Sequence, residues 1–159
     1  MADIARFRRN TAAVLEGVRV QPGPEWDDLE LRVRPGNPAY DDALSRAKSD
    51  LVRQARADGR LKPREGYEQL PISERLALGN ALCLKMLFIE PYNLTIAGKP
   101  VDAAKYRELA QTEEFADLMD AVWAGVEIAT TMRQAQTEGA GGNSPAPSPM
   151  PFDGAALQP

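Results

Sequence analysis

Between residues 18 and 33 apolar and charged positions alternate, which predicts two short strands with one apolar and one charged face. The apolar positions are Val18 and Val20 in the first strand and Leu29, Leu31 and Val33 in the second. Pro22, Gly23 and Pro24 supply the turn between the strands. Because an isolated hairpin is marginal in water, its apolar face is expected to lie against helices.

The stretch Ile72–Ile89 has a different pattern, and the rest of the chain is expected to be organised around it. Its apolar residues cannot share one stripe, which is typical of a helix that is covered from several sides. Ser73 is the predicted N-cap, and Pro91 is predicted to end the helix. Charged and amide side chains interrupt the apolar run, so a membrane span is not predicted.

Capping residues predict further helices before this central one. Asp3 is a candidate cap for a short first helix. Asn10 and Thr11 are candidate caps for Ala12–Glu16, and Asn37 is the candidate cap of a longer helix. The longer helix carries a narrow apolar stripe, which consists of Tyr40, Leu44, Ala47, Leu51 and Ala55. Residues 60–71 are expected to form a loop, with Tyr67 and Leu70 as its anchors.

Two more helices are predicted after residue 100. Asp102 is placed to cap a helix that runs to Leu109, and Thr112 is placed to cap a closing helix. The apolar residues of the closing helix follow the helical period: Phe115, Leu118, Met119, Val122, Trp123, Val126 and Ala129. This amphipathic helix is expected to lie across the central one.

Together these elements predict a mainly α (α+β) fold, with four to five helices around a central buried helix and a small N-terminal β-hairpin. Residues 1–138 are expected to form a single globular domain. Residues 139–159 are rich in Gly, Pro and Ser and bury no patterned apolar face, so they are expected to form a disordered tail.

Charge is divided unevenly along the chain. The formal net charge is −4, but residues 1–64 carry thirteen basic and ten acidic side chains, so the acidic excess lies in the second half. This asymmetry allows charge-guided docking without naming a partner. A single cysteine forms no intramolecular disulfide, and the N-terminus has no apolar signal region, which favours a cytoplasmic protein.

Few residues offer catalytic chemistry. The chain contains no histidine, the commonest general base and metal ligand. Cys83 lies within the apolar stretch, where a small buried hydrophobe is a better interpretation than a nucleophile. Asp41/Asp42 and Glu113/Glu114 sit at predicted helix N-termini, where acids are simply stabilising. No glycine-rich phosphate loop is present. The sequence therefore predicts no enzyme activity, no cofactor and no metal site.

Two features are candidates for binding. Basic side chains recur between residues 46 and 64, but aspartates lie among them and no aromatic residue is interleaved after Tyr40. A solvated helix face explains this run better than a nucleic-acid site, so nucleic acid is not an expected partner. Trp26, in the hairpin turn, is either a lid on the hairpin or a partner-binding anchor.

Three segments between Phe7 and Met132 carry a resemblance to a known family. They read FRRNTAAVLEGVRVQ followed by LELRVRPGNPAYDDAL, then LCLKMLFIEPYNLTIAGKPVDAAKYRELA, then EEFADLMDAVWAGVEIATT. Their order resembles the tail assembly chaperones of long-tailed bacteriophages (siphophages) and related prophages. One departure is Tyr92, where many members of that family carry tryptophan.

The resemblance implies a non-enzymatic protein of the host bacterial cytoplasm. Such chaperones bind the long helical tape measure protein, keep it soluble during tail morphogenesis and leave as the tail tube protein polymerises, so they are absent from the mature virion. Self-association is left open. The alternatives are a structural connector or completion protein that stays in the tail, and a nucleic-acid-binding regulator, which depends only on the basic run.

Overall fold

The computed structural model describes residues 11–141, with side chains through Gln136, and is mainly helical with a small antiparallel β component. The helices are α1 (Ala12–Glu16), α2 (Pro38–Ala57), α3 (Ile72–Met86), α4 (Ala103–Leu109) and α5 (Ala116–Gly141). The strands are β1 (Val18–Val20), β2 (Glu30–Val33), β3 (Phe88–Tyr92), β4 (Thr95–Ile96) and β5 (Lys99–Pro100). Short 3₁₀ turns are η2 (Pro24–Trp26), η3 (Tyr67–Gln69) and η4 (Glu113–Phe115). The predicted fold class is confirmed.

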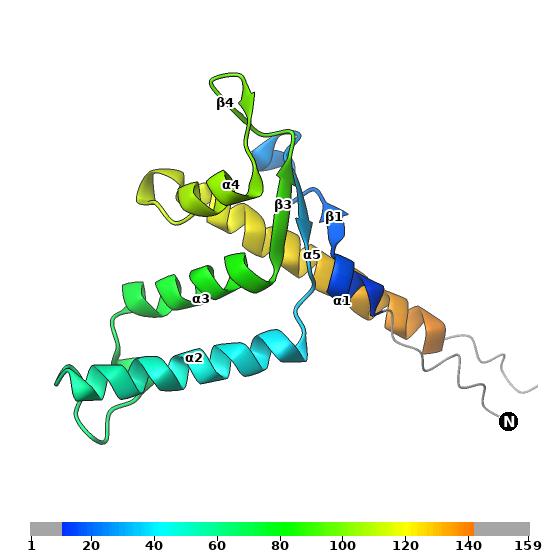
Figure 1. The fold of residues 1–159 in the computed structure, drawn as a ribbon. Coiled ribbons are helices and arrows are strands. Elements are labelled where there is room, and N and C mark those ends of the chain that lie inside the picture. Colours follow the sequence, from blue (N-terminus) through cyan, green and yellow to red (C-terminus); the bar gives the residue numbers. More distant parts are fainter. Residues whose placement is uncertain (1–10, 142–159) are drawn as a thin grey trace, which may run out of the picture.

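The predicted hairpin is confirmed and forms two strands of a three-stranded antiparallel sheet in the order β1-β2-β3. Val18 pairs with Val33, and Val20 pairs with Leu31, so the apolar positions of both strands share one face. Helix α5 covers this face (Figure 1). It comes so close at Gly125 that a Cβ atom there would stand 3.2 Å from a methyl group of Val20.

The third strand comes from residues that were predicted to be helical or irregular. Helix α3 ends at Met86, and β3 then pairs with the free side of β2, with Val33 opposite Phe88. The sequence pattern does not predict this strand, because a short apolar run fits a buried helix and a buried strand equally well. Pro91 lies within this strand instead of ending a helix, which is tolerated because β3 is an edge strand.

Helix α3 differs from its prediction at the other end as well. Pro71 occupies the N-cap position without a side-chain cap bond, so Ser73 is not the cap. Only the C-terminal part of α3 is covered on all sides, since Cys83 and Leu84 are its only buried residues. The prediction that the whole helix is buried is therefore wrong for its first two turns.

Helices α2 and α3 run side by side and extend away from the sheet (Figure 1). We call residues 45–81 the arm and the remaining described residues the body. Asn37 caps α2 as predicted, and its side chain accepts a hydrogen bond from the Tyr40 amide at 3.1 Å. At the far end of the arm, Ala55, Leu61 and Leu70 form a second small core. Leu70 is buried and Tyr67 packs beside it, so both predicted loop anchors are in place.

The closing helix begins later and ends later than its pattern predicts. Thr112 precedes η4, its side chain makes no cap bond, and α5 proper starts at Ala116. The buried side chains of α5, among them Met119, Val122 and Val126, pack with the sheet residues in the main core, while Phe115 is left exposed. Helix α5 continues to Gly141, past the predicted boundary at residue 138. The predicted helix after Asp3 and most of the predicted tail lie outside the described residues.

A membrane span is not found in residues 11–141, because no helix there combines the necessary length and apolarity.

Candidate interaction surfaces

One apolar row on α3 is buried at one end and uncovered at the other. Ile72, Leu76, Cys83 and Leu87 follow one another at spacings of four, seven and four residues, so they share a helical face. Cys83 and Leu87 are completely buried where the body covers this face. Ile72 is 66% exposed and Leu76 is 60% exposed, because nothing in the described chain covers the arm there. The helical face that enters the main core at Cys83 and Leu87 therefore carries an exposed apolar strip, Ile72 and Leu76, at the start of α3.

A hollow of about 380 Å³ lies between this part of α3 and the start of α5. It is lined by Ser73, Ala77 and Asn80 of α3, by Ala110, Gln111, Thr112 and Glu113, and by Ala116, Met119 and Asp120 of α5. Because residues four apart are neighbours on a helix, Leu76 adjoins Asn80 at the edge of the hollow. The Asn80 side-chain oxygen accepts a hydrogen bond from the Trp123 indole at 2.9 Å, which joins α3 to α5. The result is a hollow with a mixed apolar and polar lining, beside the apolar strip at Ile72 and Leu76.

Trp26, the candidate partner-binding residue of the hairpin turn, does not line this hollow. Its ring is partly buried against the main core, and its indole N–H donates to the Asp117 carbonyl at 3.1 Å. This contact attaches the turn of the hairpin to the start of α5, which is the lid arrangement. A partner-binding role for Trp26 stays a prediction.

Cys83 has the buried position that its pattern predicts, and its surroundings make it a poor nucleophile. Burial raises the pKa of the Cys83 thiol from 9.0 to about 12. Burial also raises the pKa of Tyr40 to about 12, with smaller contributions from Cys83 and Asp41. The pKa of Tyr106 is raised by burial as well. No group of three or more potential metal-binding side chains occurs in the part of the chain that the structure describes.

These buried acids predict a fall in stability at alkaline pH. Each group is neutral in the folded protein at a pH where it would ionise in the unfolded chain, so its stabilising contribution is complete below about pH 9 and is lost as pH rises toward 12. Urea unfolding at a series of pH values measures this. We expect a constant midpoint to about pH 9 and a steady decrease above it. A midpoint that is unchanged at about pH 11 would contradict the burial of these groups.

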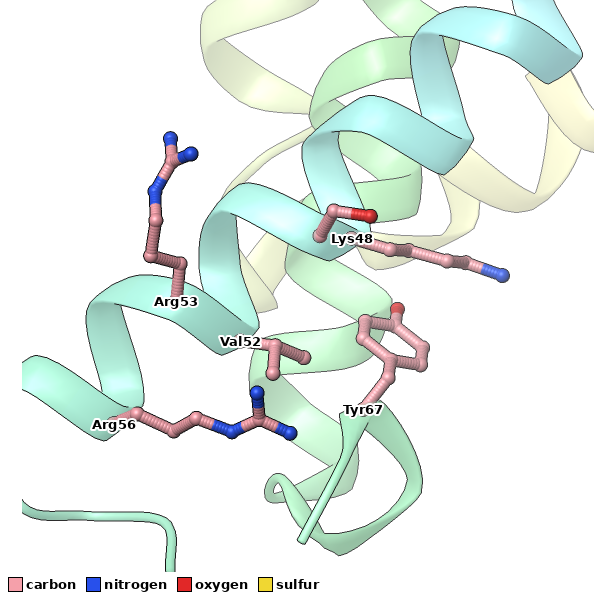
Figure 2. A pocket seen from close by; sticks show the side chains of 6 residues that line it. Lys48, Val52, Arg53, Arg56 and Tyr67 are labelled. Atoms are coloured by element: carbon pink, nitrogen blue, oxygen red, sulfur yellow. The ribbon is translucent and has the colours of Figure 1, made fainter. Parts of the chain in front are cut away.

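A second hollow lies on the outer face of the arm. It measures about 480 Å³ and is lined by Lys48, Ser49, Val52, Arg53 and Arg56 of α2 and by Tyr67 (Figure 2). The Lys48 ammonium lies 4.9 Å from the centre of the Tyr67 ring. Sequence reasoning missed this hollow, because Tyr67 is distant along the chain from the basic residues of α2. The turn after α2 brings Tyr67 back against this helix. The only indication of this contact in the sequence was the prediction that Tyr67 anchors the loop.

Comparison with protein-family models, with curated proteins and with solved structures finds no match to this chain. Function therefore has to be inferred from these surfaces and from the sequence resemblance.

Proposed function

We propose that this protein is a tail assembly chaperone of a siphophage or prophage, which binds the tape measure protein and keeps it soluble without enzymatic activity. The resemblance motivates the proposal, and the uncovered apolar strip at Ile72 and Leu76 is the observation that carries it. A long amphipathic helix that waits for its tube would aggregate through its apolar stripe. An exposed apolar strip beside a hollow of mixed polar and apolar lining is suited to covering part of such a helix.

The division between body and arm supports this proposal. The three segments that carry the resemblance include β1, β2, β3, α4, most of the described α5 and the first turns of α2. Residues 45–81 lie between the quoted segments, and they include the uncovered strip. In our proposal the body is the common scaffold, whereas the arm adapts each chaperone to its own tape measure protein.

The same geometry suits temporary binding. Two large apolar side chains and a hollow of this size offer a small contact, so one copy would bind weakly. Many copies along one helix would together cover its stripe, and each copy could leave as the tail tube protein polymerises. In this proposal the chaperone acts in the host cytoplasm and is absent from the mature virion.

Co-expression with the tape measure protein of the same phage or prophage tests the proposal. We expect the wild-type chain to keep that protein in the soluble fraction and to co-purify with it. Replacing both Ile72 and Leu76 with aspartate should weaken co-purification at least tenfold, since apolar anchors that dominate a contact contribute about 2 kcal/mol or more.

Leu15→Asp is the matched control, because Leu15 is 72% exposed and lies on α1, outside the strip and the hollow. It should leave co-purification unchanged. Equal effects of the two changes would show that general surface apolarity, not the strip, is responsible. Mass spectrometry of purified particles tests the wider proposal: a stoichiometric amount of this chain in mature tails would refute it and favour a structural tail component.

A further inference from the structure

The hollow on α2 presents positive charge that the arm does not neutralise. Arg53 forms an ion pair with Asp50 at 2.7 Å, but Arg56 donates to the Glu65 main-chain carbonyl at 2.7 Å, which is a neutral acceptor. Lys48 faces the Tyr67 ring, which is also uncharged. No carboxylate lines the hollow. Two cations there therefore lack an anionic partner among the interactions found in the described residues.

The side chains are arranged for a ligand that is part charged and part apolar. Figure 2 shows the Arg56 guanidinium reaching toward Val52 and Tyr67, whereas Arg53 extends away from Tyr67. Val52 and the Tyr67 ring supply an apolar wall between Arg56 and Lys48. Arginine and tyrosine are also among the side chains that most often dominate binding energy at protein interfaces.

The surroundings of the hollow favour a small anion over an extended one. Aspartates 41, 42, 50 and 58 lie along or just after α2, and the whole chain carries a net charge of −4. A nucleic-acid strand would meet these carboxylates on either side of the hollow. The side-chain carboxylates of a short acidic segment would meet only the two cations.

We propose that this hollow binds an acidic segment of a protein partner. One partner carboxylate pairs with Arg56 and a second pairs with Lys48, and an apolar side chain between them packs on Val52 and Tyr67. The site is on the opposite helix of the arm from the uncovered strip of α3, and it does not depend on the chaperone proposal. A partner that uses both would hold the arm from two sides.

The test is an NMR titration of the isotopically labelled full chain with a short peptide in which glutamate and aspartate flank a phenylalanine. Shifts should concentrate at Val52 and Tyr67. A matched peptide with glutamine and asparagine should bind at least fivefold more weakly. An oligothymidine strand of the same charge should also bind more weakly.

Variants on one helix locate the contact. Because a partly exposed charge pair contributes about two- to five-fold to affinity, Lys48→Gln combined with Arg56→Gln should weaken peptide binding by about four- to twenty-five-fold. Arg53→Gln removes the same charge from the side chain that points away, and it should change affinity less than about twofold. Lys48→Gln alone leaves the Arg56–Glu65 contact intact, and it should still weaken binding measurably.

Three results would overturn the proposal. Equal binding of the acidic and amide peptides would show that charge does not contribute to binding. Preferred binding of the oligothymidine would assign the hollow to nucleic acid. Shifts that avoid Val52 and Tyr67, or a peptide affinity that is unchanged in both Lys48 variants, would place the peptide elsewhere.

Discussion

Replacing Phe88 with alanine is expected to lower the free energy of unfolding by about 3–5 kcal/mol, the range for truncating a large buried aromatic side chain. Phe88 is completely buried at the start of β3. Its ring stacks on Tyr106 of α4, with centroids 4.6 Å apart, and the Arg107 guanidinium lies 5.1 Å from its centre. The substitution would therefore leave a cavity where α4 meets the sheet.

Urea unfolding followed by circular dichroism measures this effect. Phe115→Ala is the matched control, because Phe115 is 37% exposed and its truncation should cost less than about 1 kcal/mol. If Phe88→Ala cost no more than the control, the third strand would not belong to the core. The residues from 88 onward would then continue α3 or form a loop, as the sequence pattern predicts.

The elements that depend on local chemistry could be predicted from the sequence. Alternation between Val18 and Val33 gave the hairpin, because one face of a sheet must be buried and the other solvated. Asn37 before Pro38 gave the start of α2, and Asp102 gave the start of α4. In both caps a side-chain oxygen accepts from a nearby amide, so no distant contact is needed.

The parts that depend on contacts between distant segments could not be predicted. Phe88 and Ile89 become strand because β2 has a free edge, and nothing in the run itself distinguishes that outcome from a longer helix. The same limit applies to the candidate sites. The apolar residues around α3 suggested uniform burial. However, the body covers only the C-terminal part of this helix, so Leu76 is exposed and Cys83 is buried. Tyr67 joins the basic face of α2 only through the fold.

The polar contacts at the end of α3 supply hydrogen-bond donors to main-chain carbonyls where the chain turns from helix to strand. Arg34 continues β2 along the same corner, and its amide donates to the Leu87 carbonyl at 2.7 Å. Its guanidinium also donates to the Met86 carbonyl at 3.0 Å. Helix α4 supplies the remaining donors from the other side through Arg107. Three segments that are far apart in the sequence thus meet at one corner, which also supports the buried end of the apolar row on α3.

Replacing Arg107 with methionine is expected to destabilise the protein by about 2–4 kcal/mol, because carbonyls that lose a charged donor in a partly buried place are costly. The Arg107 guanidinium donates to the carbonyls of Leu84 at 3.1 Å, Phe88 at 3.2 Å and Ile89 at 3.4 Å. Methionine keeps an apolar stem of similar length, so the change removes mainly the donors. A positive charge at a helix C-terminus is also attracted to the negative end of the helix dipole, which stabilises the helix.

Arg107→Lys separates the charge from the geometry of the donors. Lysine retains the positive charge, but a single ammonium cannot span three carbonyls as a planar guanidinium does. We expect a loss between those of the wild type and Arg107→Met in urea unfolding, together with faster hydrogen exchange of the amides around Leu87 in both variants. If Arg107→Met stayed within about 0.5 kcal/mol of the wild type, water would be an adequate partner for these carbonyls, and the corner would not depend on α4.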